Sequence, residues 1–135
     1  MNEHFKIIIM ADHDAAYLIV AKDALDDNYN VITVPTGKTL LLLLESIKPD
    51  LILMDIEISD MDGLEIVGAL KSSDKTAHIP IILLSECTDP EREKKGLEMG
   101  ASDCLAKPFS GECLARRIEM HLLDGAQNER GGQNE

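Results

Sequence analysis

Short apolar runs recur along this 135-residue chain, and helix-like segments separate them. The runs are KIIIM at 6–10, NVITV at 30–34, LILM at 51–54 and PIILL at 80–84, with a weaker run, DCLA, at 103–106. They are apolar at successive positions rather than at alternate ones, which indicates strands that are buried on both faces. We therefore predict an α/β fold, with a doubly wound five-stranded parallel sheet and helices on both faces.

The segments between the runs have helical periodicity. Leu18, Ala21 and Leu25 recur at i, i+3 and i+7, the spacing of one helical face. Asp89 followed by Pro90 combines an N-cap side chain with a proline in the first turn, which is typical of a helix start. The helices are predicted over 14–27, 38–47, 63–72, about 89–100 and 111–123.

Composition favours one domain that does not bind polyanions. The domain is expected over 1–123, and the polar, glycine-rich residues 124–135 are predicted to be a tail or the start of a linker. A net charge of −12 and the lack of Trp argue against direct binding of nucleic acid or a membrane surface. The longest apolar run, LLLLL at 40–44, is too short to span a bilayer. Three cysteines without CxxC spacing fit a reducing, cytoplasmic compartment.

Polar side chains follow four of the predicted strands. Asp12 and Asp14 follow the first strand, Asp55 the third, Ser85 the fourth and Lys107 the fifth. The carboxyl ends of parallel strands meet at one edge of a sheet, where such folds place their functional crevice. Carboxylates, a hydroxyl and an ammonium group at one edge suit phosphoryl chemistry.

Several motifs resemble the receiver domain of two-component response regulators. They are Asp55 with the MDG that ends at Gly63, ILLS ending at Ser85, GLEMGASD before the lysine, and AKPF at 106–109. Their order and spacing are more specific than any one of them, and the resemblance covers roughly residues 5–123. It implies a flavodoxin-like strand order, 2-1-3-4-5.

The resemblance also implies a role for each site residue. Asp55 would accept a phosphoryl group, and Mg²⁺ (or Mn²⁺) would be held by Asp12, Asp55 and the backbone carbonyl of Glu57. Lys107 would pair with the carboxylate and then with the phosphoryl oxygens. Ser85 would move to hydrogen-bond the phosphoryl group. The concentration of acids after LILM is then tolerated, because a cation and a lysine offset it.

The implied function is a signalling switch rather than an enzyme in the usual sense. The phosphoryl donor would be a phosphohistidine on a sensor histidine kinase or a phosphotransfer protein. Phosphorylation would change the face formed by about residues 89–123, which would bind an output domain or a second copy of the chain. Only slow self-catalysed phosphotransfer and dephosphorylation are expected.

The acidic site departs from the family pattern. Ala11 lies where receivers usually have a first acid, so we expect weaker Mg²⁺ binding than is usual unless Asp14 compensates. Mg²⁺ titration of an Asp12→Ala variant would test this ligand. His13 is interpreted as a solvent-exposed loop residue, and surface positions are expected for His4, His78 and His121.

Two further departures concern coupling and access. Cys104 occupies the place of the Tyr or Phe whose rotamer usually follows the Ser/Thr movement, so the output coupling is expected to differ. We interpret this cysteine as a small buried filler rather than a redox centre. Glu86 replaces a small residue beside the acceptor, where it could narrow access.

Two other classes of function are also suggested by parts of the sequence. A pseudo-receiver that binds proteins without phosphorylation is suggested by Ala11 and Cys104. An aspartyl-phosphate hydrolase is suggested only by DIEIS at 55–59, which follows the third strand rather than the first. GKT at 37–39 is not a P-loop, because Ile32 stands where the motif needs glycine. Asp62 is predicted to cap a helix.

Overall fold

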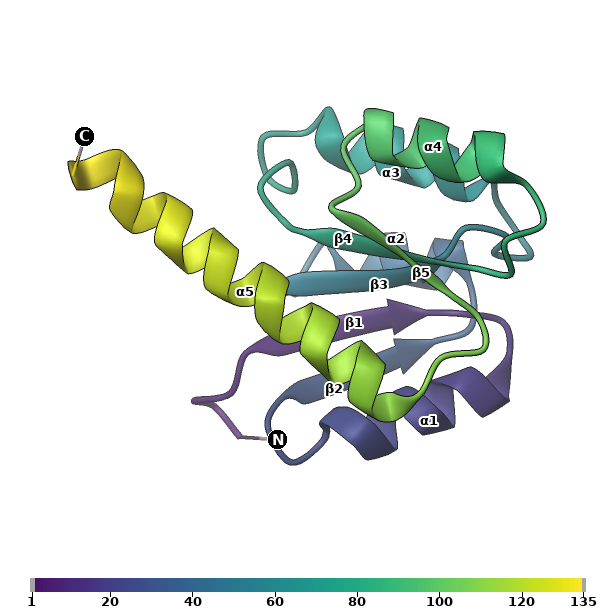
Figure 1. Cartoon of the computed structure of the whole chain (residues 1–135), viewed down its shortest axis with the longest axis horizontal. Coiled ribbons are helices and arrows are strands. Elements are labelled where there is room, and N and C mark those ends of the chain that lie inside the picture. The colour runs from purple at the N-terminus through teal and green to yellow at the C-terminus, as the bar shows by residue number, and fades with distance from the viewer. Residues whose placement is uncertain (1, 135) are drawn as a thin grey trace.

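Five parallel strands form the sheet of this computed structural model, which describes the backbone of residues 2–134 and the side chains of residues 2–123 (Figure 1). The strands are β1 (Ile7–Ala11), β2 (Asn30–Val34), β3 (Leu51–Asp55), β4 (Ile81–Ser85) and β5 (Asp103–Ala106). Their order is β2-β1-β3-β4-β5, and every neighbouring pair is parallel. The predicted fold class and strand order are confirmed.

Helices cover both faces of the sheet. They are α1 (Ala15–Leu25), α2 (Gly37–Leu43), α3 (Gly63–Lys71), α4 (Pro90–Glu98) and α5 (Gly111–Asn134). In Figure 1, α1 and α5 lie on one face, and α2, α3 and α4 lie on the other. The second helix ends earlier than predicted, because residues 44–46 form turns. The backbone is helical through 124–134, where a tail or linker was expected, and a domain boundary at 123 stays a prediction.

The core consists of two halves, because successive strand residues point to opposite faces. Ile8 and Met10 pack with the α1 and α5 side chains, while Ile9 and Ala11 pack with those of α2 and α3. The three central strands bury all or nearly all of their residues. This burial on both faces is the physical reason for the continuous apolar runs in the sequence.

A side-chain oxygen caps each of the five helices, and at α5 it is Ser110 Oγ, which accepts a hydrogen bond from Cys113 N at 3.0 Å. Asp14 accepts a hydrogen bond from Ala16 N, and Asp62 accepts one from Leu64 N, so the predicted cap at Asp62 is confirmed. Thr36 and Asp89 cap α2 and α4 in the same way. These caps fix the loops that leave the carboxyl ends of β1, β2, β3 and β4.

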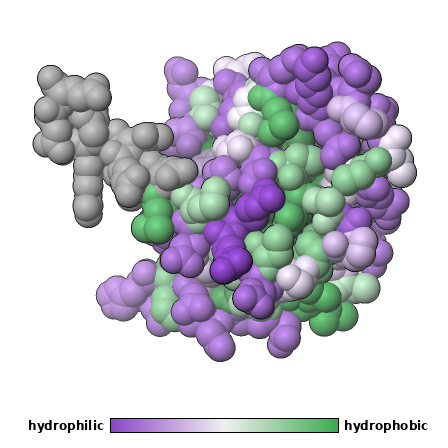
Figure 2. All heavy atoms as spheres, viewed as in Figure 1, coloured by the Kyte–Doolittle hydropathy of each residue, from purple (hydrophilic) through white to green (hydrophobic). Residues whose placement is uncertain are grey.

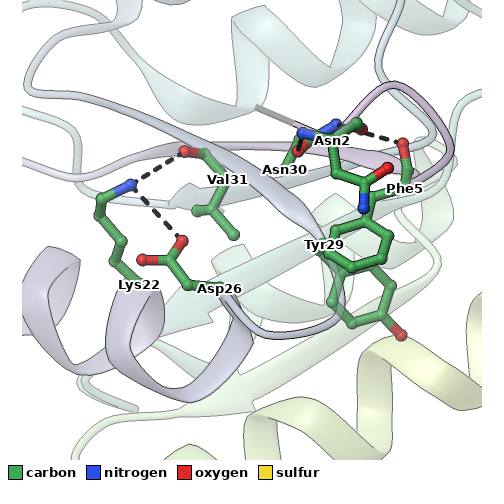
Figure 3. A pocket seen from close by; sticks show the side chains of 7 residues that line it. All are labelled: Asn2, Phe5, Lys22, Asp26, Tyr29, Asn30 and Val31. Atoms are coloured by element: carbon green, nitrogen blue, oxygen red, sulfur yellow. Dashed lines mark hydrogen bonds and ion pairs between the residues drawn. The ribbon is translucent and has the colours of Figure 1, made fainter.

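Asn30, the first residue of β2, ties the N-terminal segment to the start of that strand (Figure 3). Its amide nitrogen donates to Asn2 O and Phe5 O, and its oxygen accepts from Asn2 N. A shallow pocket lies here, lined in part by Lys22 and Tyr29. It lies at the amino ends of the strands, because Asn30 pairs with Ile7 at the start of β1.

The surface mixes polar and apolar side chains. Figure 2 shows mostly polar side chains over the face seen in Figure 1, with apolar ones between them. The largest exposed apolar side chains are spread over four helices: Ile19, Val20, Leu42, Leu97, Met120 and Leu123. In the described part of the chain, no helix has the length and apolar character that a membrane span requires.

An ionic cluster anchors α5 to β5. Asp103 Oδ2 lies 2.7 Å from Arg117 Nη1 and 3.0 Å from His121 Nε2. The prediction that His121 is a surface residue is wrong, because its side chain is largely buried against this carboxylate. Burial alone would raise the pKa of Asp103, but the contacts with His121 and Arg117 lower it below the usual value.

We expect Asp103→Asn to lower the free energy of unfolding at pH 7 by about 0.5–1 kcal/mol, a small value because Arg117 is partly exposed. A carboxyl group whose pKa is depressed on folding stabilises above its unfolded pKa and loses that contribution as the pH falls. Urea unfolding should therefore show the difference shrinking below about pH 4. Asp26→Asn, in the exposed pair with Lys22, is the control and should change little.

Two glycines of α3 should respond oppositely to alanine. A Cβ at Gly63 would lie 2.5 Å from the carbonyl oxygen of Ile56, whereas one at Gly68 would meet only the flexible end of Met99, at 3.1 Å. We expect Gly63→Ala to destabilise the fold by about 1–3 kcal/mol. Gly68→Ala should be neutral or stabilising, because alanine favours helix. Thermal unfolding would check both, and equal losses would contradict the packing argument.

Candidate functional site

Three charged side chains from three strand ends meet at one edge of the sheet. Asp12 directly follows β1, Asp55 ends β3, and Lys107 directly follows β5. Lys107 Nζ lies 2.7 Å from Asp12 Oδ2 and 3.2 Å from Asp55 Oδ2. These three residues were predicted to converge at this edge, and they lie together there.

The cluster is buried and contains more negative than positive charge. The side chains of Asp12, Asp55 and Lys107 are almost inaccessible to water, and two carboxylates share a single ammonium group. Burial raises the pKa of Asp12, and the contact with Lys107 only partly offsets this. Burial alone would lower the pKa of Lys107, but Asp12 and Asp55 together raise it. Lys107 therefore stays charged, but its single positive charge cannot neutralise both carboxylates.

Ser85 lies beside the cluster but is turned towards its own loop. It ends β4, one residue beyond the residue that pairs with Asp55. Its Oγ accepts a hydrogen bond from Cys87 N at 3.0 Å, and its carbonyl oxygen accepts one from Lys107 N at 2.7 Å. The backbones of Ser85 and Lys107 are thus joined by a hydrogen bond.

The four acids between 55 and 62 have separate partners. Asp55 Oδ1 accepts a hydrogen bond from Glu57 N at 2.9 Å. Arg92 donates to Glu57 Oε1 and to Asp62 Oδ1, at 3.1 Å each. Asp60 accepts hydrogen bonds from the first two backbone N–H groups of α2, which lowers its pKa. Of these four acids, only Asp55 contacts the buried Lys107.

Two further side chains border the cluster: His13, which the sequence placed beside the acid site, and Tyr17, which was not predicted to contribute. His13 is half exposed, as expected of a loop residue, yet its Nδ1 lies 3.2 Å from Asp55 Oδ2. The ring of Tyr17 lies 4.4 Å from Lys107 Nζ, a cation–π contact, and packs on Phe109. Tyr17 lies in the first turn of α1, and nothing in its spacing pointed to a contact with Lys107.

The other candidates lie outside the cluster. Asp14 caps α1, so its carboxylate is already engaged. Cys104 is only half buried, and its thiol donates to Glu93 Oε1 at 3.4 Å. Burial, together with Glu93, raises the pKa of this thiol to about 12. A thiol so reluctant to ionise is a poor nucleophile, which agrees with a packing role.

The residues present fit a divalent cation. Two buried carboxylates have one ammonium between them, and Asp12 Oδ2 has no well-oriented hydrogen bond besides that ion pair. One ligand atom each from Asp12, His13 and Asp55 lies within 4.8 Å of the others. A cation here would supply the missing positive charge.

Comparisons with known proteins agree with this geometry. Residues 7–119 match the response regulator receiver domain family. The chain is 33% identical over 123 residues, 91% of its length, to a Vibrio cholerae protein named "Probable cyclic di-GMP phosphodiesterase". It is 30% identical over 117 residues, 87% of its length, to the Bacillus subtilis alkaline phosphatase synthesis transcriptional regulatory protein PhoP. The chain spans only 27% and 48% of these two relatives.

A solved structure shows the same fold. The CheY-like receiver domain from Methanospirillum hungatei superposes with a TM-score of 0.85 at 25% identity, over 92% of this chain and 98% of that one. The family match covers most of the chain, and the strand order and the charged cluster at the carboxyl edge agree with it. The chain therefore belongs to the response regulator receiver domain family of two-component signalling.

Proposed function

We propose that the protein is a phosphoacceptor switch in which Asp55 takes a phosphoryl group from a phosphohistidine of a sensor kinase or phosphotransfer protein. The observation that carries this is the buried Asp55 carboxylate with Lys107 Nζ 3.2 Å from Oδ2. Receiver domains are regulatory, and membership of that family supports a switch rather than a metabolic enzyme.

Asp55 is oriented for attack on phosphorus. Glu57 N holds Oδ1, so the carboxylate is fixed with Oδ2 towards Lys107. An Asp55 oxygen would form the new O–P bond while the N–P bond to the donor histidine breaks, and its electron pair leaves with the imidazole. Lys107 then faces the oxygens on which negative charge gathers.

A divalent ion, Mg²⁺ or Mn²⁺, would neutralise charge between the carboxylate and the incoming phosphoryl group. Asp12, Asp55 and the backbone carbonyl of Glu57 would hold it. Ala11 offers no oxygen from its side chain, which supports the expectation of weaker Mg²⁺ binding than is usual for the family.

Ser85 would couple phosphorylation of Asp55 to a change at α4. Its hydroxyl would leave Cys87 N for the phosphoryl group, and its loop leads directly into α4. The α4-β5-α5 face would then bind an output domain or a second copy of the chain. Cys104 lies on this face and bonds to Glu93 of α4, so it couples β5 to α4 without an aromatic rotamer. The three free cysteines support a cytoplasmic location.

A pseudo-receiver that acts without phosphorylation is the second candidate. Ala11 and Cys104 favour it, since each replaces a residue type on which the usual switch relies. The intact pair of Asp55 and Lys107 favours the phosphoacceptor.

Acetyl phosphate with Mg²⁺ should add the mass of one phosphoryl group to the intact protein. Asp55→Asn should abolish the gain, and Asp62→Asn, an acid that caps α3, should retain it. Beryllofluoride with Mg²⁺ should shift NMR resonances of the Ser85 loop. No mass gain and no shift in the wild type would favour the pseudo-receiver.

Asp12→Asn should stabilise the metal-free protein at pH 7, because it removes a buried charge that Lys107 only partly offsets. We expect a gain on the order of 1 kcal/mol in the free energy of unfolding. Excess Mg²⁺ should stabilise the wild type more than the variant. Equal stabilisation of both proteins by Mg²⁺, measured by thermal unfolding, would remove Asp12 from the ligand set.

A further inference from the structure

The imidazole of His13 lies next to the carboxylate of Asp55. His13 Nδ1 lies 3.2 Å from Asp55 Oδ2 and 3.9 Å from the carboxylate oxygen Oδ1 of Asp12. His13 follows Asp12 in the loop that leaves β1, two residues after Ala11. The three side chains form a mixed nitrogen and oxygen donor set at the acid edge.

The loop around His13 is held in place on both sides. Asp12 N donates to Val34 O at 3.1 Å, and Asp12 Oδ1 accepts a hydrogen bond from Asp14 N at 2.9 Å. Asp14 in turn caps α1. The imidazole is therefore carried by a short loop whose two neighbouring residues are fixed, and little ordering would be needed for it to bind a ligand.

Two of the distances between the donors are close to those of an octahedral shell. With ligands about 2.1 Å from an ion, neighbouring donors lie about 3.0 Å apart and opposite donors about 4.2 Å apart. The two distances from His13 Nδ1, 3.2 and 3.9 Å, are each within about 0.3 Å of one of these values, and one donor atom from each of the three residues lies within 4.8 Å of the others. The carboxylates alone would suit Mg²⁺, but a neutral imidazole nitrogen favours transition ions.

We infer that His13 is a metal ligand that replaces the missing acid at Ala11, and that the site therefore prefers a divalent transition ion, such as Ni²⁺, Zn²⁺ or Co²⁺, to Mg²⁺. The ligands from side chains are His13 Nδ1 with oxygens of Asp12 and Asp55. The inference rests on the metal site of the proposed function and changes which ions that site selects.

A salt link offers the competing explanation. A protonated His13 could donate directly to Asp55 Oδ2, with no metal between them. In a metal complex, by contrast, Nδ1 carries no proton and Nε2 carries one. The two arrangements therefore differ in which ring nitrogens are protonated, and that difference can be measured.

Metal titration of tag-free, unphosphorylated protein tests the inference. All proteins carry Cys87→Ser, which removes an exposed thiol that could bind the same ions. Isothermal titration should give a dissociation constant for Ni²⁺ at least about tenfold below that for Mg²⁺. His13→Ala should raise the Ni²⁺ constant about tenfold or more and leave the Mg²⁺ constant nearly unchanged.

Two variants sharpen the comparison. His13→Asp replaces the nitrogen by an oxygen donor, so Mg²⁺ affinity should rise and the preference for Ni²⁺ should fall. His78→Ala, at an exposed histidine outside the site, should leave both affinities unchanged. NMR of protein labelled with ¹⁵N-histidine should show the His13 Nδ1 resonance shifting on addition of Zn²⁺, with Nε2 still protonated.

Unchanged Ni²⁺ affinity in His13→Ala would overturn the inference, as would a His13 ring protonated on both nitrogens in the presence of Zn²⁺. Neither measurement involves phosphorylation. A failure of acetyl phosphate to modify Asp55 would contradict the proposed function but not these results, so the two failures are distinguishable.

Discussion

One ammonium group shared by two buried carboxylates is the interaction on which this site depends. Asp12 and Asp55 end adjacent strands, while Lys107 follows β5, which is separated from β3 by β4. Neighbouring strands lie about 4.8 Å apart, so the cation must reach across a whole strand to contact both acids. Only a long side chain does this, and the buried apolar strands supply the rigid frame that keeps the three ends in register.

The surrounding acids do not add to this charge, because each has its own cation or backbone donors. Arg92 donates to Glu57 and to Asp62. The hydrogen bond from Leu64 N, together with Arg92, lowers the pKa of Asp62. Asp60 is held by the first turn of α2. The acids after β3 thus fix the starts of α2 and α3 and tie α4 to this segment, and only Asp55 among them faces Lys107.

The sequence was sufficient for the sheet, because burial on both faces leaves a pattern that is local in the chain. The convergence of Asp12, Asp55 and Lys107 could also be predicted, since parallel strands place their carboxyl ends at one edge. His13 could be placed beside the acid site, but its contact with Asp55 and the burial of His121 could not be predicted, because whether a histidine meets a carboxylate depends on side chains from distant elements. His13 meets Asp55 and His121 meets Asp103 only after the sheet and helices have formed.

The loss of the first acid and the presence of His13 are best explained together. An alanine at 11 removes a carboxylate from a cluster that already holds more negative than positive charge, which by itself weakens cation binding. An imidazole adds a donor without adding negative charge, so a transition ion can be bound with less repulsion between the ligands. If His13 binds the ion as we infer, the exchange of an acid for a histidine would alter the identity of the ion rather than the existence of the site, and Asp55 keeps its contact with Lys107 in either case.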